Sequence, residues 1–557
     1  MNKEEHIMKN INFVVATFLV LISSLLNAQS HNEEVTVKGK YAPQIQKSER
    51  LIKAPEMPKR DFNIPNYEIN TNDFQYKHKA ELEPISPLSY TQKDKVNISN
   101  NFVKAGFGTR VSPDFLFRHY SNISKRTSLG IGINHNSTWL GMKDYVNSKY
   151  MNNAFKVSMT NRFSQLQLHS HIGYHYDMYH INPSSETSVS RNIHTLNANV
   201  TADNNKSSYK SLYDEFSLSY NYSGIQKGMQ ENLLSLKAHL EHSNSWFRYG
   251  NGTQTLTADI KAEISNIEQT LFLLSFNPHI DLNDDFFNLR LGFCVDVKTN
   301  SISKGGIYPD IKGSIYLFNG SIEFYAGLGG KTKINTLKEI LDENPFIVSN
   351  LQNMGEFDYE KTYFDFQGGL KFKALNILNG NVGVRYRRID NHVFYVSSAI
   401  QEGAFDIILN NCYVFNFNID LNAKISDDIK IVADFAYNKY DINKAYMISD
   451  TPVTREHAWY KPEVEFNLKG IYTYSQKWSF NIATYVEGMR YALTEYSYNG
   501  IKKLKPICDI QLGCDYNFKD NLTFYAEVKN LINNKYQIYY GYPSYGFQAF
   551  VGFKYRF

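Results

Sequence analysis

The feature that most constrains the fold is a set of segments, each near ten residues long, in which apolar and polar side chains alternate. The last twelve residues, GFQAFVGFKYRF, show it: Val551, Phe553, Tyr555 and Phe557 share one face, and most residues between them are charged, polar or small. A period of two is β-strand geometry. The apolar face then meets either a soluble core or, in a membrane barrel, lipid around a wet lumen.

The same alternation recurs from about Ile98 to the end, for example in NLTFYAEVKN, CYVFNFNIDLNAK, NLRLGFCVDVK and IKIVADFAYNKY. About ten residues is the length that a tilted strand needs to cross a membrane. After residue 30 no stretch approaches the roughly 18 apolar residues of a transmembrane helix. Tyrosine and phenylalanine raise the aromatic content to 15%, and aromatic girdles are typical of outer-membrane barrels.

The connections between these segments alternate in length along the C-terminal half. Tight polar turns lie at 282–285, 318–321, 425–428, 475–478 and 518–521, and long connections lie at 336–360, 397–410, 443–460, 493–505 and 533–546. Outer-membrane barrels have short periplasmic turns and long extracellular loops, whereas a soluble sandwich has no reason to keep its long loops at one end. The sequence therefore predicts an all-β, antiparallel transmembrane barrel of about 22 strands, with 18 or 20 left open.

The N-terminus predicts export. Lys9, an apolar run over Ile11–Leu26 and the small Ala28 form a secretory signal peptide, 1–29, rather than an anchored helix. Residues 30–97 contain six of the fifteen prolines, which favours an extended segment in the periplasm or the lumen over a packed core. The barrel is expected over 98–557 in the outer membrane of a Gram-negative cell, in contact with its lipid.

Charge and motifs exclude several classes of function. The formal net charge of +4 does not indicate nucleic acid as a partner. The sequence has no nucleophile elbow, phosphate loop or His-Glu-x-x-His helix, so we expect neither an enzyme nor a bound cofactor.

One strand, LQLHSHIGYHYDMYHI, carries a candidate metal site. His169, His171 and His175 share a face with Asp177. A His-x-His pair can converge on zinc, copper or nickel. The alternative is that these histidines only supply the polar face that a lumen requires.

The C-terminal region carries a family resemblance. The stretch Asn530–Tyr536, followed by Pro543 and Gly546 and a last strand that ends in Phe, resembles the closing hairpin of TonB-dependent receptors, the plugged transporters of the outer membrane. The Leu-Asn-Ala-Gln stretch at the cleavage site is similar to signal peptides of the Bacteroidetes group. The resemblance implies a receptor-type barrel and a role in transport.

The terminal aromatic residues Phe553, Tyr555 and Phe557 also resemble the signal by which the barrel-assembly machinery recognises its substrates. That machinery is therefore an expected partner during biogenesis.

The N-terminal part departs from the family, whose members carry a folded plug of well over a hundred residues. Here only residues 30–97 precede the barrel, so the resemblance implies a receptor barrel that lacks the plug. EEVTVKG (33–39) resembles a phrase in or near the TonB-contacting segment of many receptors. Val35, Thr36 and Val37 are therefore candidates for strand addition to TonB or another periplasmic protein; the alternative is a linker strand.

A barrel of 22 strands is normally filled. Residues 30–97, an infolded loop such as NTLKEILDENPFIVSNLQNMGEFDYEK (335–361) and a separate protein are the candidates. We expect a barrel that passes or receives a solute, with its lumen closed by the N-terminal segment or a partner. The alternative is a non-transporting structural or assembly subunit of a surface complex.

Overall fold

The computed structural model describes residues 100–557, except for 186–187, 205–211, 245–252, 268, 300–304, 351–356, 375–376, 443–445, 449–450, 454–456, 476 and 495–499. The predicted signal peptide, the segment 30–97 and the candidate partner strand Val35–Val37 lie outside the described residues. Of the described helices, none is long and apolar enough to cross a membrane.

Twenty-two strands form one antiparallel sheet, as the sequence predicts. They are β1(Asn101–Gly108), β2(Ser112–Asn122), β3(Thr127–Thr138), β4(Tyr150–Arg162), β5(Leu166–Ile181), β6(Val189–Asn204), β7(Leu212–Ile225), β8(Gln230–Asn244), β9(Thr253–Asn266), β10(Thr270–Asn283), β11(Phe287–Lys298), β12(Gly305–Leu317), β13(Ile322–Ile334), β14(Tyr359–Ala374), β15(Leu378–Ser397), β16(Phe405–Lys424), β17(Ile429–Ile442), β20(Val464–Tyr474), β21(Trp478–Glu487), β24(Ile507–Lys519), β25(Leu522–Lys529) and β28(Gln548–Arg556).

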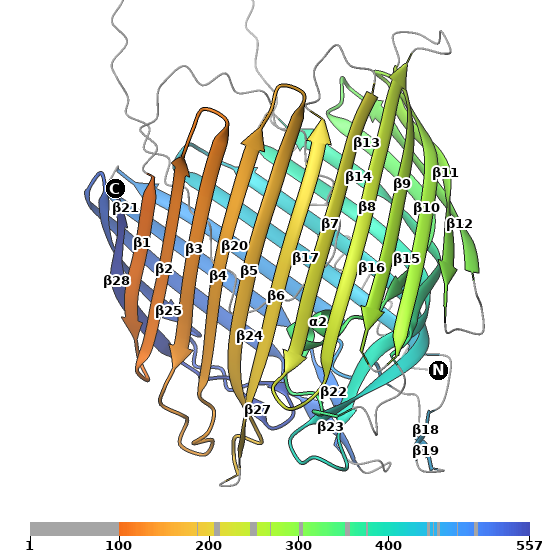
Figure 1. Ribbon diagram of the computed structural model, residues 1–557. Coiled ribbons are helices and arrows are strands. Elements are labelled where there is room, and N and C mark those ends of the chain that lie inside the picture. The colour runs from red at the N-terminus through yellow and green to blue at the C-terminus, as the bar shows by residue number, and fades with distance from the viewer. Residues whose placement is uncertain are drawn as a thin grey trace, which may run out of the picture. The chain divides into compact units, whose positions relative to one another are not determined.

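The sheet closes on itself because the first strand pairs with the last (Figure 1). Phe102 lies opposite Arg556 in an antiparallel ladder. The backbone N–H of Asn101 donates to the carbonyl of Phe557 at 2.9 Å, and the N–H of Phe557 donates back at 3.1 Å. Closure pairs the backbone groups that an open edge would expose, which is the condition for a sheet to cross a bilayer.

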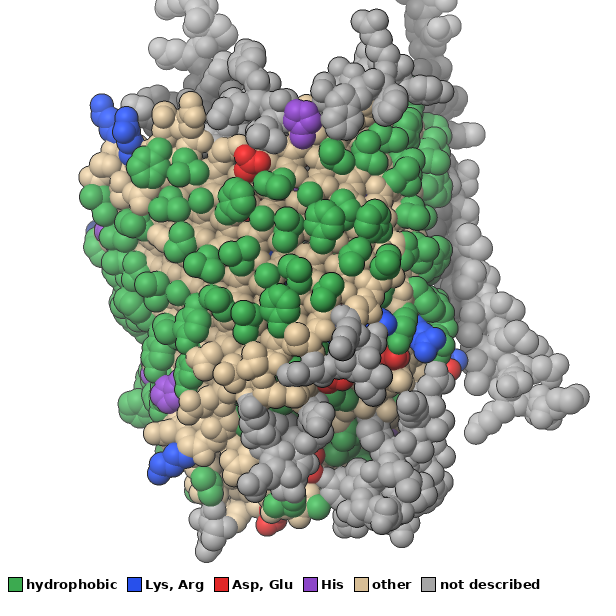
Figure 2. All heavy atoms as spheres, turned by 45° about the vertical axis from the view of Figure 1, so that its right-hand side comes forward, with side chains coloured by type: hydrophobic (Ala, Val, Ile, Leu, Met, Phe, Trp, Pro, Cys, Tyr) green, Lys and Arg blue, Asp and Glu red, His purple; other side chains and the backbone are tan. Residues whose placement is uncertain are grey.

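The two faces of the strands differ as the alternation predicts. Val551 and Phe553 point outward and are 63% and 40% exposed, whereas the ammonium of Lys554, between them and the C-terminus, lies 2.7 Å from the carboxylate of Asp515 on the inner side. On the face of the outer wall that Figure 2 shows, hydrophobic side chains form a band, with charged and histidine side chains mostly at its ends. The chain is thus an outer-membrane type of barrel, with its apolar face towards lipid.

The inner wall is polar and many of its charges are paired. Lys104 contacts Asp114 at 2.7 Å, and Lys371 contacts Glu323 at 3.2 Å. Arg290 donates two hydrogen bonds to Asp281, at 2.7 and 3.1 Å. A wall of this kind suits a wet lumen.

The two ends of the barrel differ. The terminal end, where residues 101 and 557 meet, carries the predicted tight turns of the C-terminal half. The opposite end, the loop end, carries the connections 335–358, 398–404, 443–463, 488–506 and 530–547. Three of these contain hairpins that the sequence did not indicate: β18(Tyr446–Ile448) with β19(Thr451–Val453), β22(Arg490–Leu493) with β23(Ile501–Leu504), and β26(Gln537–Tyr539) with β27(Tyr542–Pro543).

Candidate functional site

Several loops pack into one apolar cluster at the loop end of the barrel. Residues 335–350, which we call the cap, carry the helix α2(Leu337–Glu343), and Figure 1 shows α2 within the outline of the barrel near its lower end. Leu337 and Ile347 of the cap are fully buried. They belong to the same cluster as Cys412 and Val414 of the inner wall. The described part 335–350 of the loop that the sequence offered as one filler therefore packs against the inner wall at the loop end.

Strand β8 holds the beginning of α2. The carboxylate of Glu231 accepts hydrogen bonds from the backbone N–H of Leu337 at 2.8 Å and of Lys338 at 3.4 Å, and a third from Ser265 at 2.7 Å. Glu231 is buried. A carboxylate here satisfies N–H groups that the first turn of a helix leaves unpaired, and it interacts favourably with the helix dipole.

The end of α2 is held from the opposite part of the barrel. The carboxylate of Glu343 pairs with the ammonium of Lys461 and accepts a hydrogen bond from Tyr395 at 3.2 Å. Its backbone carbonyl accepts a hydrogen bond from the hydroxyl of Tyr539 at 2.7 Å. Burial, with the nearby Glu343 carboxylate, raises the pKa of Tyr539 well above its ordinary value, so the phenol stays protonated and donates.

The segment after α2 is fastened by one arginine of β6. The guanidinium of Arg191 donates to the carbonyls of Pro345, at 3.1 Å, and Ile347, and to the hydroxyl of Ser349 at 2.7 Å. Arg191 is only 4% exposed. The Ile347 carbonyl is buried with it, and Pro345 and Ser349 are half-buried, so the donors of this arginine are used to hold the cap against β6.

Aromatic side chains join the cap to the loops around it. Phe346 stacks on Tyr542 with ring centroids 3.7 Å apart. The hydroxyl of Tyr542 donates to the carbonyl of Gly403 at 2.6 Å. Phe405 exchanges backbone hydrogen bonds with the cap: its N–H donates to the Phe346 carbonyl at 3.0 Å, and its carbonyl accepts from Val348 at 2.9 Å. The cap thus bridges the wall from β6 and β8 to β15, β16 and the last long loop.

The last long loop, 530–547, has its own anchor. Arg490, which is 2% exposed, donates to the carbonyls of Gln537 and Ile538 at 2.8 Å each and lies 3.1 Å from the carboxylate of Glu487. The hydroxyl of Tyr545 donates to the carbonyl of Ser148. Three tyrosines of this loop, Tyr539, Tyr542 and Tyr545, therefore tie it to other loops.

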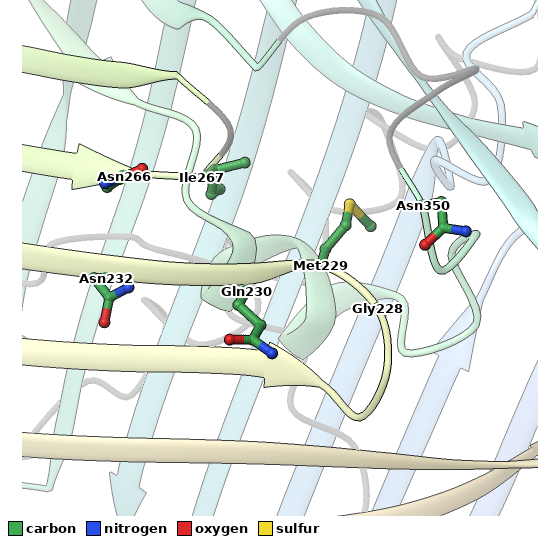
Figure 3. Close-up of a pocket in the computed structure, with 7 residues that line it drawn as sticks. All are labelled: Gly228, Met229, Gln230, Asn232, Asn266, Ile267 and Asn350. Carbon is green, nitrogen blue, oxygen red and sulfur yellow. The ribbon is translucent and has the colours of Figure 1, made fainter.

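A cavity of about 330 Å³ lies where the end of the cap meets the β7–β8 connection and the end of β9 (Figure 3). Its polar lining is made of carboxamides, and Met229 and Ile267 add an apolar part; the lining residues are Gly228, Met229, Gln230, Asn232, Asn266, Ile267 and Asn350. The backbone N–H of Met229 donates to the carbonyl of Ser349 at 2.9 Å. This contact brings the cap against the rim.

The candidate metal ligands His169, His171 and His175 share one face of β5, the lumen side, while Ile172 between them points outward. His169 contacts Thr160 at 3.0 Å and Asp203 at 3.5 Å. His169 and His175 are six residues apart, which on a strand is about 20 Å. Across the described part of the chain, no three His, Cys, Asp or Glu side chains converge as metal ligands do. The metal site stays a prediction.

Sequence reasoning missed the residues that hold the cap, above all Arg191 and Glu231. One local signal was available. Thr336-Leu337-Lys338-Glu339 is a capping box, and the Thr336 hydroxyl accepts the N–H of Glu339 at 3.2 Å. It predicts a helix start inside a long connection.

The terminal aromatics Phe553 and Tyr555 lie on the outer face of β28, and Phe557, which follows the strand, stacks with Tyr555 with centroids 5.3 Å apart. Their recognition by the barrel-assembly machinery stays a prediction.

No protein-family model matches the chain, and no curated protein matches it. Its fold is similar to the ferric-catecholate import receptor Fiu from E. coli K12, with 11% sequence identity, a TM-score of 0.62 and coverage of 84% of this chain and 83% of that one. It is similar to the siderophore receptor PiuA from Acinetobacter baumannii, with 11% identity, a TM-score of 0.61 and coverage of 83% of this chain and 82% of that one. It is also similar to the copper transporter OprC, with 12% identity, a TM-score of 0.57 and coverage of 84% of this chain and 82% of that one. The chain therefore has the fold of the outer-membrane TonB-dependent receptor barrel, as its closing hairpin predicts.

Proposed function

We propose that this protein passes a solute across the outer membrane and that the cap is the gate at the outer mouth. The observation that carries the proposal is the cap itself, a segment that crosses the mouth of a closed 22-strand barrel. The fold of import receptors supports the direction of transport, and the polar lumen wall suits the passage of a hydrophilic solute.

The bonds of the cap fit a gate better than a fixed stopper. Arg191, Glu231 and Lys461 each belong to the wall or to a neighbouring loop, and each reaches the cap through hydrogen bonds or an ion pair. Such contacts can be exchanged for contacts to a ligand or to water. Breaking them leaves the covalent connections of the cap to β13 and β14 intact. By the rule of outer-membrane barrels, the loop end faces outside, so a solute meets the cap first.

A second closure is proposed at the terminal end. Residues 30–97 lead into β1 at that end, and we assign to them, or to a periplasmic partner such as TonB, the inner closure of the lumen. Val35, Thr36 and Val37 are the proposed strand for that partner.

Single-channel recording in planar bilayers tests the proposal. Four proteins are compared: the full chain, the chain lacking 30–97, the Arg191→Met variant, and the variant that combines both changes. Two closures in series predict large, steady currents only in the combined form. Arg290→Met is the matched control, because it removes another lumen arginine that contacts Asp281 and no part of the cap.

Currents in the chain lacking 30–97 alone would show that the cap does not seal the mouth. Silence in all four proteins, each folded, would refute the gate and favour the structural subunit of a surface complex.

A further inference from the structure

The cavity of about 330 Å³ beside the end of the cap (Figure 3) reaches the outer surface of the barrel. Asn232 of β8 is two residues from Leu234, which is 44% exposed on the lipid side. Asn266 of β9 is likewise two residues from Ile264, which is 42% exposed. Side chains two residues apart on a strand share a face, whereas Glu231, next to Asn232, points inward and holds α2. The two asparagines of the cavity therefore lie on the outer wall.

The strand register places this wall at the edge of the apolar band. One row across β7, β8 and β9 consists of Tyr222, Asn232 and Asn266. The next row towards the terminal end consists of Tyr220, Leu234 and Ile264. Tyrosines are typical of the level where the apolar core of a membrane meets the headgroups. With the loop end outside, the cavity lies at the headgroup level of the outer leaflet.

The lining of the cavity suits an uncharged ligand rich in hydroxyl groups. The described lining residues carry no charge, and four of them are the carboxamides Gln230, Asn232, Asn266 and Asn350. A carboxamide offers two donors and an acceptor, and a hydroxyl group both donates and accepts. Neighbouring hydroxyl groups of a sugar can therefore pair with these side chains. An ionised group would find no countercharge in the described lining.

Two tyrosines border the carboxamides. The hydroxyl of Tyr220 donates to the Asn232 carbonyl oxygen at 2.7 Å, which fixes the orientation of that amide. A Cβ placed on Gly224 would meet the phenol oxygen of Tyr222 at 2.7 Å and Cγ of Gln230 at 3.2 Å. Tyr222 therefore lies beside Gln230 and adds an aromatic edge with a hydroxyl to this part of the wall.

We propose that the cavity binds an uncharged sugar, and that the sugar is the headgroup of a lipid in the outer leaflet. The headgroup occupies the carboxamide lining, and the acyl chains run along the apolar row that contains Leu234 and Ile264. A dissolved saccharide has the same hydroxyl groups and is the second source of this chemistry. The site does not need transport, so it does not rest on the proposed function.

Native mass spectrometry of the purified full chain, with digalactosyldiacylglycerol as the probe, tests the site. Phosphatidylcholine with the same acyl chains is the reference lipid. We expect one glycolipid to be bound in preference to the reference. Asn232→Leu and Asn266→Leu should each weaken that binding by about fivefold, since a neutral hydrogen bond contributes about 1 kcal/mol. Leucine extends the apolar outer face, so both variants should assemble normally.

Asn153→Leu is the matched control. Asn153 is two residues from Phe155, which is 45% exposed on the outer face of β4. It is a carboxamide of the same face and lies outside the lining of the cavity. Its replacement should leave the binding of the glycolipid unchanged.

Isothermal titration with the free disaccharide of the same headgroup separates the two sources. Binding of the glycolipid that the free disaccharide does not reproduce identifies a lipid headgroup as the ligand. Equal affinity for both supports the sugar site and identifies a dissolved saccharide as its ligand. The absence of a preference for the glycolipid over phosphatidylcholine, or a preference that survives the two leucine substitutions combined, overturns the proposal. Neither measurement depends on whether the barrel conducts, so failure of the gate is distinguished from failure of this site.

Discussion

Replacing Arg191 by methionine should open the cap without unfolding the barrel. Methionine keeps the length and apolar stem of the side chain but removes the donors that reach Pro345, Ile347 and Ser349. A hydrogen bond to a charged group contributes about 1.5–3 kcal/mol, and unpaired buried acceptors add a cost. Because the bonds share one guanidinium, we expect the substitution to destabilise the closed cap by about 3 kcal/mol in total. This corresponds to an increase of roughly a hundredfold in the fraction of molecules with an open cap.

Native-state hydrogen exchange measures that fraction amide by amide. The N–H of Val348, bonded to the carbonyl of Phe405, reports on the cap. Its exchange should accelerate by about a hundredfold in Arg191→Met, while amides of β10 to β13 keep their rates. Arg290→Met should leave the cap unchanged. The reasoning is refuted if the cap amides keep their rates, or if the whole barrel accelerates equally, because the arginine would then support the fold rather than the cap.

Three further predictions follow from single contacts. Glu231→Gln removes the charge at the start of α2 and should destabilise the closed cap by about 1–2 kcal/mol, seen as faster exchange confined to α2. Tyr539→Phe deletes the bond to the Glu343 carbonyl and should cost about 1 kcal/mol, with the largest effect at the end of α2 and none in the barrel strands. Leu218→Arg places a charge on the lipid face and should destabilise the folded barrel by about 2–4 kcal/mol, measured by urea unfolding in bilayers; equal loss in the lumen-facing Ser219→Arg would contradict the assignment of faces.

The barrel was predictable because its signal is local. Alternation with a period of two places Phe553 outside and Lys554 inside without knowledge of any partner strand. The C-terminal turns were equally readable. In the N-terminal half the rule of turn lengths failed: the facing ends of β6 and β7, and of β8 and β9, lie at the terminal end and are farther apart in sequence than those of β7 and β8 or of β9 and β10, which lie at the loop end. The length of a connection alone therefore did not predict at which end of the barrel it lies in that half.

The cap was not predictable because its contacts are distant in sequence. Arg191 lies 156 residues before Ile347, and Glu231 lies 106 residues before Leu337. A charge at the end of a strand has the same local pattern whether it meets water or a loop from across the barrel. Only the capping box of Thr336 and Glu339 is a signal between residues close in sequence. It predicts a helix but does not predict where the helix packs.

The central claim is that two closures block a passage through the outer membrane. The most direct test is the sensitivity of cells to a large antibiotic that the outer membrane excludes, in strains that express each of the four proteins at equal levels. The account predicts that only the combined form, with Arg191→Met and without residues 30–97, sensitises the cells. Cells that stay resistant although the combined form is folded in the outer membrane would contradict it.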